Sequence, residues 1–169
     1  MRERRASRGA GRRDGEFEAF VAGAAGRLLH AATLLTAEPP DDNPRARRLL
    51  TLALAHTYAR WDGVRCEDPY ERTRSFLVTR FAHAAWHHHG GLRRARPDPR
   101  RPLVHLSPQE RLVVVLRLYE AVAEKQTAAL LGLPLERVRT LCDRATALLL
   151  HPPRNPAPAV VGGAKVAAS

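Results

Sequence analysis

The segment EKQTAALLGLPLERVRTLCDRATALLL, residues 124–150, constrains the fold of this chain more than any other. Two stretches with apolar residues at three- and four-residue steps flank a Gly-Leu-Pro sequence. This pattern predicts a short helix, a tight turn and a longer helix. Gly132 can adopt the positive φ that such a turn requires. The spacing is typical of a helix-turn-helix, a unit that either recognises DNA or only packs against the rest of a protein.

The longer helix of this unit carries basic residues between its apolar positions. The positions expected to face the core are Leu135, Val138, Leu141, Cys142, Ala145, Leu148 and Leu149. Four other positions face outward or sideways, where polar side chains can reach phosphates or guanine edges, and these are Arg137, Arg139, Thr140 and Arg144. Arginine is also an ordinary residue of solvated helix faces, so periodicity alone leaves both interpretations open.

The charge balance favours a polyanionic partner. The chain of 169 residues has 28 Lys and Arg against 17 Asp and Glu, a formal net charge of +11. Such a charge fits nucleic acid or an anionic membrane. Charges interrupt the apolar runs before the roughly 20 residues of a membrane span, and the start lacks the apolar core of a signal peptide. We therefore expect a cytoplasmic protein that binds no membrane.

Composition divides the chain into five parts. Residues 1–13 are basic and almost without large apolar side chains, which predicts a disordered arm. Residues 90–105 are rich in glycine, proline and arginine and predict a flexible linker, and residues 151–169 predict a disordered tail. The two periodic pieces, residues 14–89 and 106–150, predict an all-α protein of two small helical domains.

Two short segments carry the signature of a helix start. DPYE begins at Asp68 and SPQE begins at Ser107, and each combines a capping side chain, a proline at the first helical position and an acid that reaches back. Apolar periodicity also predicts a helix that begins at a cap on Asp14 and a helix over residues 45–61.

The second piece, LSPQERLVVVLRLYEAVAEKQTAALLGLPLERVRTLCDRATALL, closely resembles the C-terminal, promoter-binding domain of extracytoplasmic-function sigma factors, in particular the actinobacterial group without additional domains. FEAFVAGAAGRLLHAATLLTAEP, ARRLLTLALAHTYARWDGV and DPYERTRSFLVTRFAHAAWHHH resemble the successive helices of that family's N-terminal domain. Together these resemblances cover about residues 16–150. They imply a sigma-two-like bundle followed by a C-terminal helix-turn-helix domain.

The resemblance also implies a function. Members of this family bind core RNA polymerase and promoter DNA to initiate transcription without a cofactor, and an anti-sigma factor is a further candidate partner. The residues expected on the polymerase are Arg48, Leu49, Thr51 and Leu52. Those expected near the minus-ten element are Trp86, His87, His88 and His89. Those expected on the minus-thirty-five element are Arg137, Arg139, Thr140 and Arg144.

Several positions depart from the family pattern. Arg48 replaces an acid and Thr51 an amide in the polymerase-binding run, Thr79 replaces an asparagine, Pro134 replaces a serine cap and Leu141 replaces a polar or basic residue. A run of histidines also replaces a run of arginines. These changes leave two alternatives open: a degenerate sigma-like DNA-binding regulator that does not initiate transcription, and a helical protein-interaction adaptor.

Other chemistry is disfavoured. His83 and His87 lie one helical turn apart, as metal ligands do, but no acidic or cysteine ligand is near them in the sequence. No phosphate-binding loop or catalytic grouping is evident, so we expect no enzyme. Trp61 is expected to have a structural packing role, and Glu120 and Glu124 are expected to be ordinary surface residues.

Overall fold

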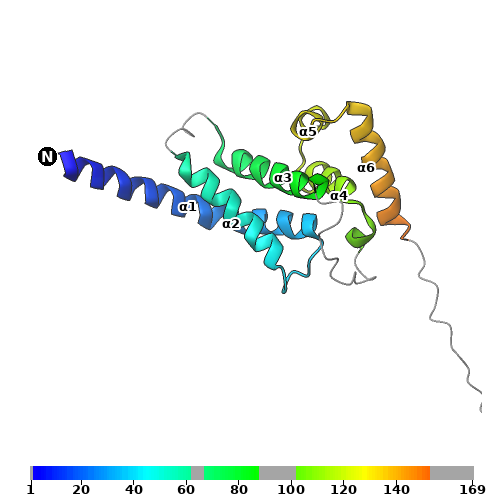
Figure 1. Ribbon diagram of the computed structural model, residues 1–169, viewed down its shortest axis with the longest axis horizontal. Coiled ribbons are helices and arrows are strands. Elements are labelled where there is room, and N and C mark those ends of the chain that lie inside the picture. The colour runs from blue at the N-terminus through cyan, green and yellow to red at the C-terminus, as the bar shows by residue number, and fades with distance from the viewer. Residues whose placement is uncertain (1, 62–66, 88–101, 153–169) are drawn as a thin grey trace, which may run out of the picture.

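The computed structural model describes residues 2–61, 67–87 and 102–152. These residues form helices and no strand, in the order α1 (Arg2–Thr36), α2 (Pro44–Ala59), α3 (Pro69–His87), the 3-10 helix η2 (Pro102–His105), α4 (Pro108–Val114), the π-helix η3 (Val115–Tyr119), α5 (Glu124–Leu131) and α6 (Leu135–Leu150) (Figure 1). The predicted all-α fold class is confirmed.

Helix α1 begins at Arg2, so residues 2–13 are helical where the sequence predicted a disordered arm. Arg13 donates a hydrogen bond to the carbonyl of Tyr58 over 2.5 Å, and its guanidinium lies 4.7 Å from the centroid of that ring. Asp14, expected as a helix cap, accepts a hydrogen bond from the Tyr58 hydroxyl at 2.6 Å. These contacts join α2 to the end of the segment at Arg13 and to the residue that follows it.

Helix α1 is also long and apolar enough, by length and composition, to cross a membrane over Gly11–Thr36. This differs from the expectation that charges interrupt every apolar run too early. The helix lies against α2 and α3, and its side chains at Leu28, Ala32 and Leu35 are fully buried. The core helix of a soluble protein passes the same test of length and composition as a membrane span, because it also buries a wide apolar face.

Polar contacts fix α2 against its neighbours. The Glu38 carboxylate accepts hydrogen bonds from the backbone amides of Arg45 and Ala46 at 3.2 and 2.8 Å, which caps the start of α2. Burial favours a raised pKa for Glu38, but the Arg45 side chain and these amides lower it below its usual value. Farther along, the hydroxyls of Thr57 and Thr73 are hydrogen-bonded at 2.8 Å in the interface of α2 and α3.

The predicted helix starts are found at both proline segments. The Asp68 carboxylate accepts from the amide of Tyr70 at 2.9 Å. Ser107 and Glu110 form the complete capping box, with amide-to-side-chain distances of 3.3 and 2.7 Å. Glu71, expected to reach back in the first of these caps, instead forms an ion pair with Arg74.

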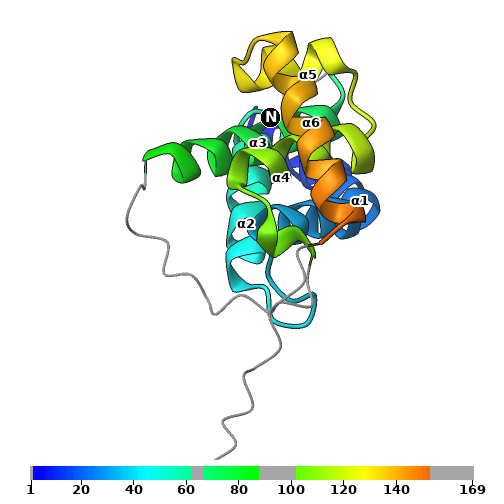
Figure 2. The same cartoon turned by 90° about the vertical axis from the view of Figure 1, so that its right-hand side faces the viewer.

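The two halves of the chain lie against each other and share one hydrophobic cluster (Figures 1 and 2). The sequence predicted two domains joined by a linker over residues 90–105. Residues 88–101 lie outside the described residues, and residues 102–105 form η2, whose Leu103 packs against a second, small cluster. The shared cluster includes Leu28 and Leu77 from the first half and Leu112, Leu116 and Val138 from the second.

A buried carboxylate lies at the boundary between the halves. The side chain of Glu120, just after η3, is only 1% exposed. It accepts hydrogen bonds from the Tyr70 hydroxyl at 2.9 and 3.0 Å, and it lies 3.6 Å from both Arg27 and Arg74. Burial and the hydrogen bond to Glu120 raise the pKa of Tyr70. The expectation that Glu120 is a surface residue was wrong, because the residues that cover it come from the other half of the chain.

Candidate nucleic-acid interface

Helices α5 and α6 form the predicted helix-turn-helix at one end of the molecule (Figure 2). Helix α5 ends at Leu131 and is capped by Gly132, which has the predicted positive φ of 63°. The amide of Leu133 donates to the carbonyl of Ala128 over 3.0 Å and closes the turn. The core-facing positions of α6 are also as predicted, since Val138, Leu141 and Ala145 are buried.

The outer face of α6 presents the polar residues that the sequence singled out. Arg137, Arg139, Thr140 and Arg144 are all exposed. The side chain of Arg137 makes no hydrogen bond or ion pair with the described residues. The Thr140 hydroxyl donates to the carbonyl of Glu136 over 2.8 Å, within the helix. This face is therefore accessible to a ligand along its first two turns.

Arg139 is held between two carboxylates. Its Nε lies 3.1 and 3.2 Å from the two carboxylate oxygens of Glu124, and its Nη1 lies 2.6 Å from an oxygen of Glu136. The hydrogen bond and charge of Glu124, together with Glu136, raise the pKa of Arg139. The Glu136 contact is an ordinary i,i+3 pair that the sequence permits. The Glu124 contact crosses the turn, so periodicity gave no sign of it. Glu124, expected to be an ordinary surface residue, has a side chain that is 29% exposed and paired with Arg139.

Arg144 is joined to the start of α4. Its Nε lies 3.0 Å from Oε1 of Glu110, whose side chain is 5% exposed, while the side chain of Arg144 is 73% exposed. The other Glu110 oxygen accepts from the Ser107 amide in the capping box. Arg144 therefore links α6 to α4 while most of its guanidinium stays open to solvent.

The end of α3 is only partly described. Trp86 is half-buried and packs against the shared hydrophobic cluster. His87 is the last residue of α3, and its side chain lies outside the described residues, as do His88 and His89. Trp61 has the packing role expected of it: it is half-buried, with its ring centroid 5.1 and 5.4 Å from two phenylalanine rings of α1.

The outer face of α2 carries three of the four residues expected to contact a protein partner. Arg48, Thr51 and Leu52 are exposed, and the Thr51 hydroxyl donates to the carbonyl of Arg47 over 2.9 Å. Leu49, the fourth of these residues, is 8% exposed and belongs to the shared cluster. The apolar stripe of α2 is wide, and its pattern alone does not separate core leucines from exposed ones.

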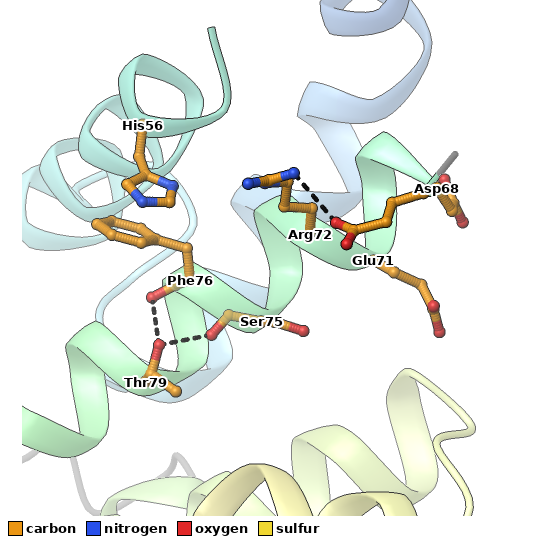
Figure 3. A pocket seen from close by; sticks show the side chains of 8 residues that line it. His56, Asp68, Glu71, Arg72, Ser75, Phe76 and Thr79 are labelled. Atoms are coloured by element: carbon orange, nitrogen blue, oxygen red, sulfur yellow. Dashed lines mark hydrogen bonds and ion pairs between the residues drawn. The ribbon is translucent and has the colours of Figure 1, made fainter. Parts of the chain in front are cut away.

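A groove of about 560 Å³ lies between α2 and the first turns of α3 (Figure 3). The His56 ring stacks on Phe76 with centroids 3.9 Å apart. Burial, and then the charges of two arginines, lower the pKa of His56. Thr79 lies where the family pattern has an asparagine. Its hydroxyl donates to backbone carbonyls of its own helix. The remaining lining includes three acids and one arginine: Glu67, Asp68, Glu71 and Arg72.

Known proteins match both halves of this chain. Residues 103–149 match the family "Sigma-70, region 4". The chain is 33% identical to the RNA polymerase sigma-E factor of Streptomyces avermitilis over 157 residues, covering 79% of this chain and 83% of that protein. It is 33% identical to the RNA polymerase sigma-E factor of Streptomyces coelicolor over 156 residues, covering 79% and 84%.

A third relative, the RNA polymerase sigma-E factor of Streptomyces antibioticus, is 34% identical over 156 residues, covering 79% of this chain and 82% of that protein. No solved structure matches the chain. The matches to these three relatives extend well beyond the helix-turn-helix half, as the resemblance of the N-terminal helices implied. The exposed basic face of α6 thus lies within the region 4 match, and the chain belongs to the RNA polymerase sigma factors of the extracytoplasmic-function type.

Proposed function

We propose that this chain is a sigma factor that acts in the cytoplasm, where it binds core RNA polymerase, recognises promoter DNA and initiates transcription. The observation that carries the proposal is the exposed basic face of α6, in a helix-turn-helix that matches region 4 of sigma-70. The net charge of +11 adds a sequence-independent attraction to the DNA backbone. An anti-sigma factor is a further proposed partner.

On the DNA side, α6 enters the major groove at the minus-thirty-five element. Arg139 lies in the first half of α6, the part of a recognition helix that contacts base edges, and the exposed guanidinium of Arg137 beside it is suited to a phosphate. Arg144 lies two turns from the start, and its exposed guanidinium is suited to a phosphate. Thr140 supplies a methyl group and a hydroxyl at the same surface. Trp86 and the three histidines that follow it are proposed to contact the minus-ten element.

On the polymerase side, the outer face of α2 is the proposed docking surface. Arg48, Thr51 and Leu52 supply one charge, one hydroxyl and one exposed apolar side chain. Arg48 reverses the charge that the family pattern has at this position. That reversal favours the second candidate function, a sigma-like regulator that binds DNA but does not recruit polymerase.

The deciding experiment is a pull-down with purified core polymerase, followed by run-off transcription on fragments of the source genome. Polymerase capture with discrete transcripts supports a sigma factor. DNA binding without polymerase capture supports the regulator. Failure to bind either one leaves the adaptor and overturns the proposal.

Two substitutions on α6 test the DNA-binding face directly. Arg139→Ala is expected to weaken binding to the preferred duplex by about tenfold to a hundredfold and to relax its sequence preference. Arg144→Ala is expected to weaken binding to every duplex and to reduce the salt slope by about one unit. Fluorescence anisotropy at several salt concentrations measures both effects. Unchanged affinity in both folded variants contradicts the assignment of α6 as the recognition helix.

A further inference from the structure

We propose that Glu124 and Glu136 are positioning residues that make Arg139 a reader of base edges and prevent it from acting as a phosphate contact. The inference rests on the proposed function, because it concerns how α6 recognises DNA. It starts from the observation that Arg139, alone among the arginines on this face, is bound by two carboxylates.

The hydrogen-bond donors of Arg139 are divided by these contacts. A guanidinium has five N–H donors in a fixed plane. In Arg139 the Nε donor is taken by Glu124, and one Nη1 donor is taken by Glu136. The second donor of Nη1 and the donors of Nη2 remain for a ligand. Nη2, which neither carboxylate contacts, keeps both of its donors, and one of them points along the terminal edge of the guanidinium, where it can meet an acceptor of guanine.

The local charge disfavours a phosphate at the same place. The guanidinium of Arg139 and the two carboxylates together carry a formal charge of −1. A phosphate brought to Arg139 meets both acids, whereas an uncharged base edge meets only the free donors. Arg137 and Arg144 differ, since Arg137 is unpaired among the described residues and Arg144 is paired with a single acid. Phosphate binding therefore falls to these two arginines.

The positions of the acids also restrict the motion of the side chain. Glu124 is the first residue of α5, and Glu136 lies in the first turn of α6, so Arg139 is held from two different helices. Negative charge is favourable at both helix starts, which keeps the carboxylates in place. A side chain fixed in this way loses less freedom when it binds a base, and preorganised contacts favour one sequence over others.

The test compares Glu124→Gln with the matched control Asp143→Asn. Both substitutions remove one negative charge, and Asp143 is an exposed acid of α6 that forms no ion pair with the described residues. The probes are the duplex that the wild-type protein selects from a randomised pool and a shuffled duplex of the same composition. Affinity is measured by fluorescence anisotropy over a range of KCl concentrations, after circular dichroism has verified that the variants are folded.

For Glu124→Gln we expect tighter binding to the shuffled duplex and a salt slope steeper by about one unit, since Arg139 then keeps only Glu136 as a charged partner and the pair no longer has a net negative charge that repels a phosphate. The ratio of selected to shuffled affinity is expected to fall about tenfold. Asp143→Asn is expected to strengthen binding to both duplexes equally and to leave that ratio unchanged. In addition, 7-deazaguanine at one guanine of the selected duplex is expected to weaken wild-type binding more than binding by Glu124→Gln, because it lacks N7.

Different results overturn the positioning role of the two acids and the DNA-recognition function of α6. If the wild-type protein prefers the selected duplex but Glu124→Gln and Asp143→Asn have the same affinity ratio, the positioning role is overturned and the proposed function stands. If the wild-type protein selects no sequence from the pool, the DNA-recognition function is overturned and the positioning role with it.

Discussion

Replacing Glu120 by alanine is expected to lower the free energy of unfolding by about 2–4 kcal/mol. The side chain of Glu120 is 1% exposed and accepts the Tyr70 hydroxyl at 2.9 Å. Alanine leaves that half-buried hydroxyl without its acceptor, which costs about 1–3 kcal/mol. It also removes the carboxylate that lies 3.6 Å from two arginines.

The ion pairs with the two arginines contribute less to the free energy of unfolding than a fully buried ion pair would. Breaking a buried ion pair costs about 3–5 kcal/mol. Arg27, however, is 52% exposed, and solvent screens its interaction. Arg74 is only 12% exposed but keeps a second carboxylate, that of Glu71, at 3.1 Å. We therefore assign the two arginines about 1 kcal/mol together, in addition to the hydroxyl.

Urea denaturation at neutral pH, followed by helical circular dichroism, measures the effect. Glu120→Gln retains the volume and one oxygen acceptor, so about half of the loss is expected. The control is Glu67→Gln, because Glu67 is 65% exposed and its pairing with Arg72 is worth less than about 1 kcal/mol. An unfolding free energy for Glu120→Ala within about 0.5 kcal/mol of wild type refutes the reasoning, since that is the range of ordinary surface substitutions.

Four other predictions can be checked with standard assays. Arg48→Asp restores the charge of the family pattern on an exposed face and is expected to tighten binding to core polymerase several-fold, measured by biolayer interferometry; unchanged or weaker binding means that this face has another role. Limited proteolysis is expected to cut within residues 90–101, and because the halves share one cluster the two fragments are expected to co-elute in size-exclusion chromatography; fragments that separate contradict this. Gly132→Ala is expected to cost about 1 kcal/mol in thermal unfolding, because the residue has a φ of 63° while the space around it is open; no loss of stability contradicts a backbone cause. The lowered pKa of His56 means that its imidazole binds a proton more readily in the unfolded chain than in the folded one, so the free energy of unfolding decreases as the pH drops below 6.5. In His56→Gln this part of the pH dependence of urea unfolding is expected to vanish.

Local features of this fold follow from short stretches of sequence. The cap at Ser107, the positive φ of Gly132 and the buried face of α6 each depend on residues within a few positions of one another. Their geometry is set by the capping residue, the absence of a Cβ and the helical period. The exposed positions Arg137 and Arg139 follow from the same period.

Long-range features were not predictable in this way. Glu120 is buried by residues of the other half, and Arg139 is bound by a carboxylate 15 positions away. Leu49 and Leu52 both suit an apolar stripe, and only the packing of α1 and α3 decides which of them is buried. Each of these cases depends on contacts that no helical period encodes. The charge reversal at Arg48 was visible in the sequence, whereas its consequence for polymerase binding depends on a surface of another molecule.

The cluster that joins the two halves has a consequence for how the protein is made. Leu77 leaves the ribosome about 40 residues before Leu116, which belongs to the same core. At a synthesis rate of roughly 5–20 residues per second, the first three helices wait for roughly 2–8 seconds with apolar side chains uncovered. During that interval the nascent chain presents a surface that chaperones bind. Premature termination before α4 therefore leaves the apolar residues of the shared cluster on the first half uncovered, which favours aggregation of the fragment.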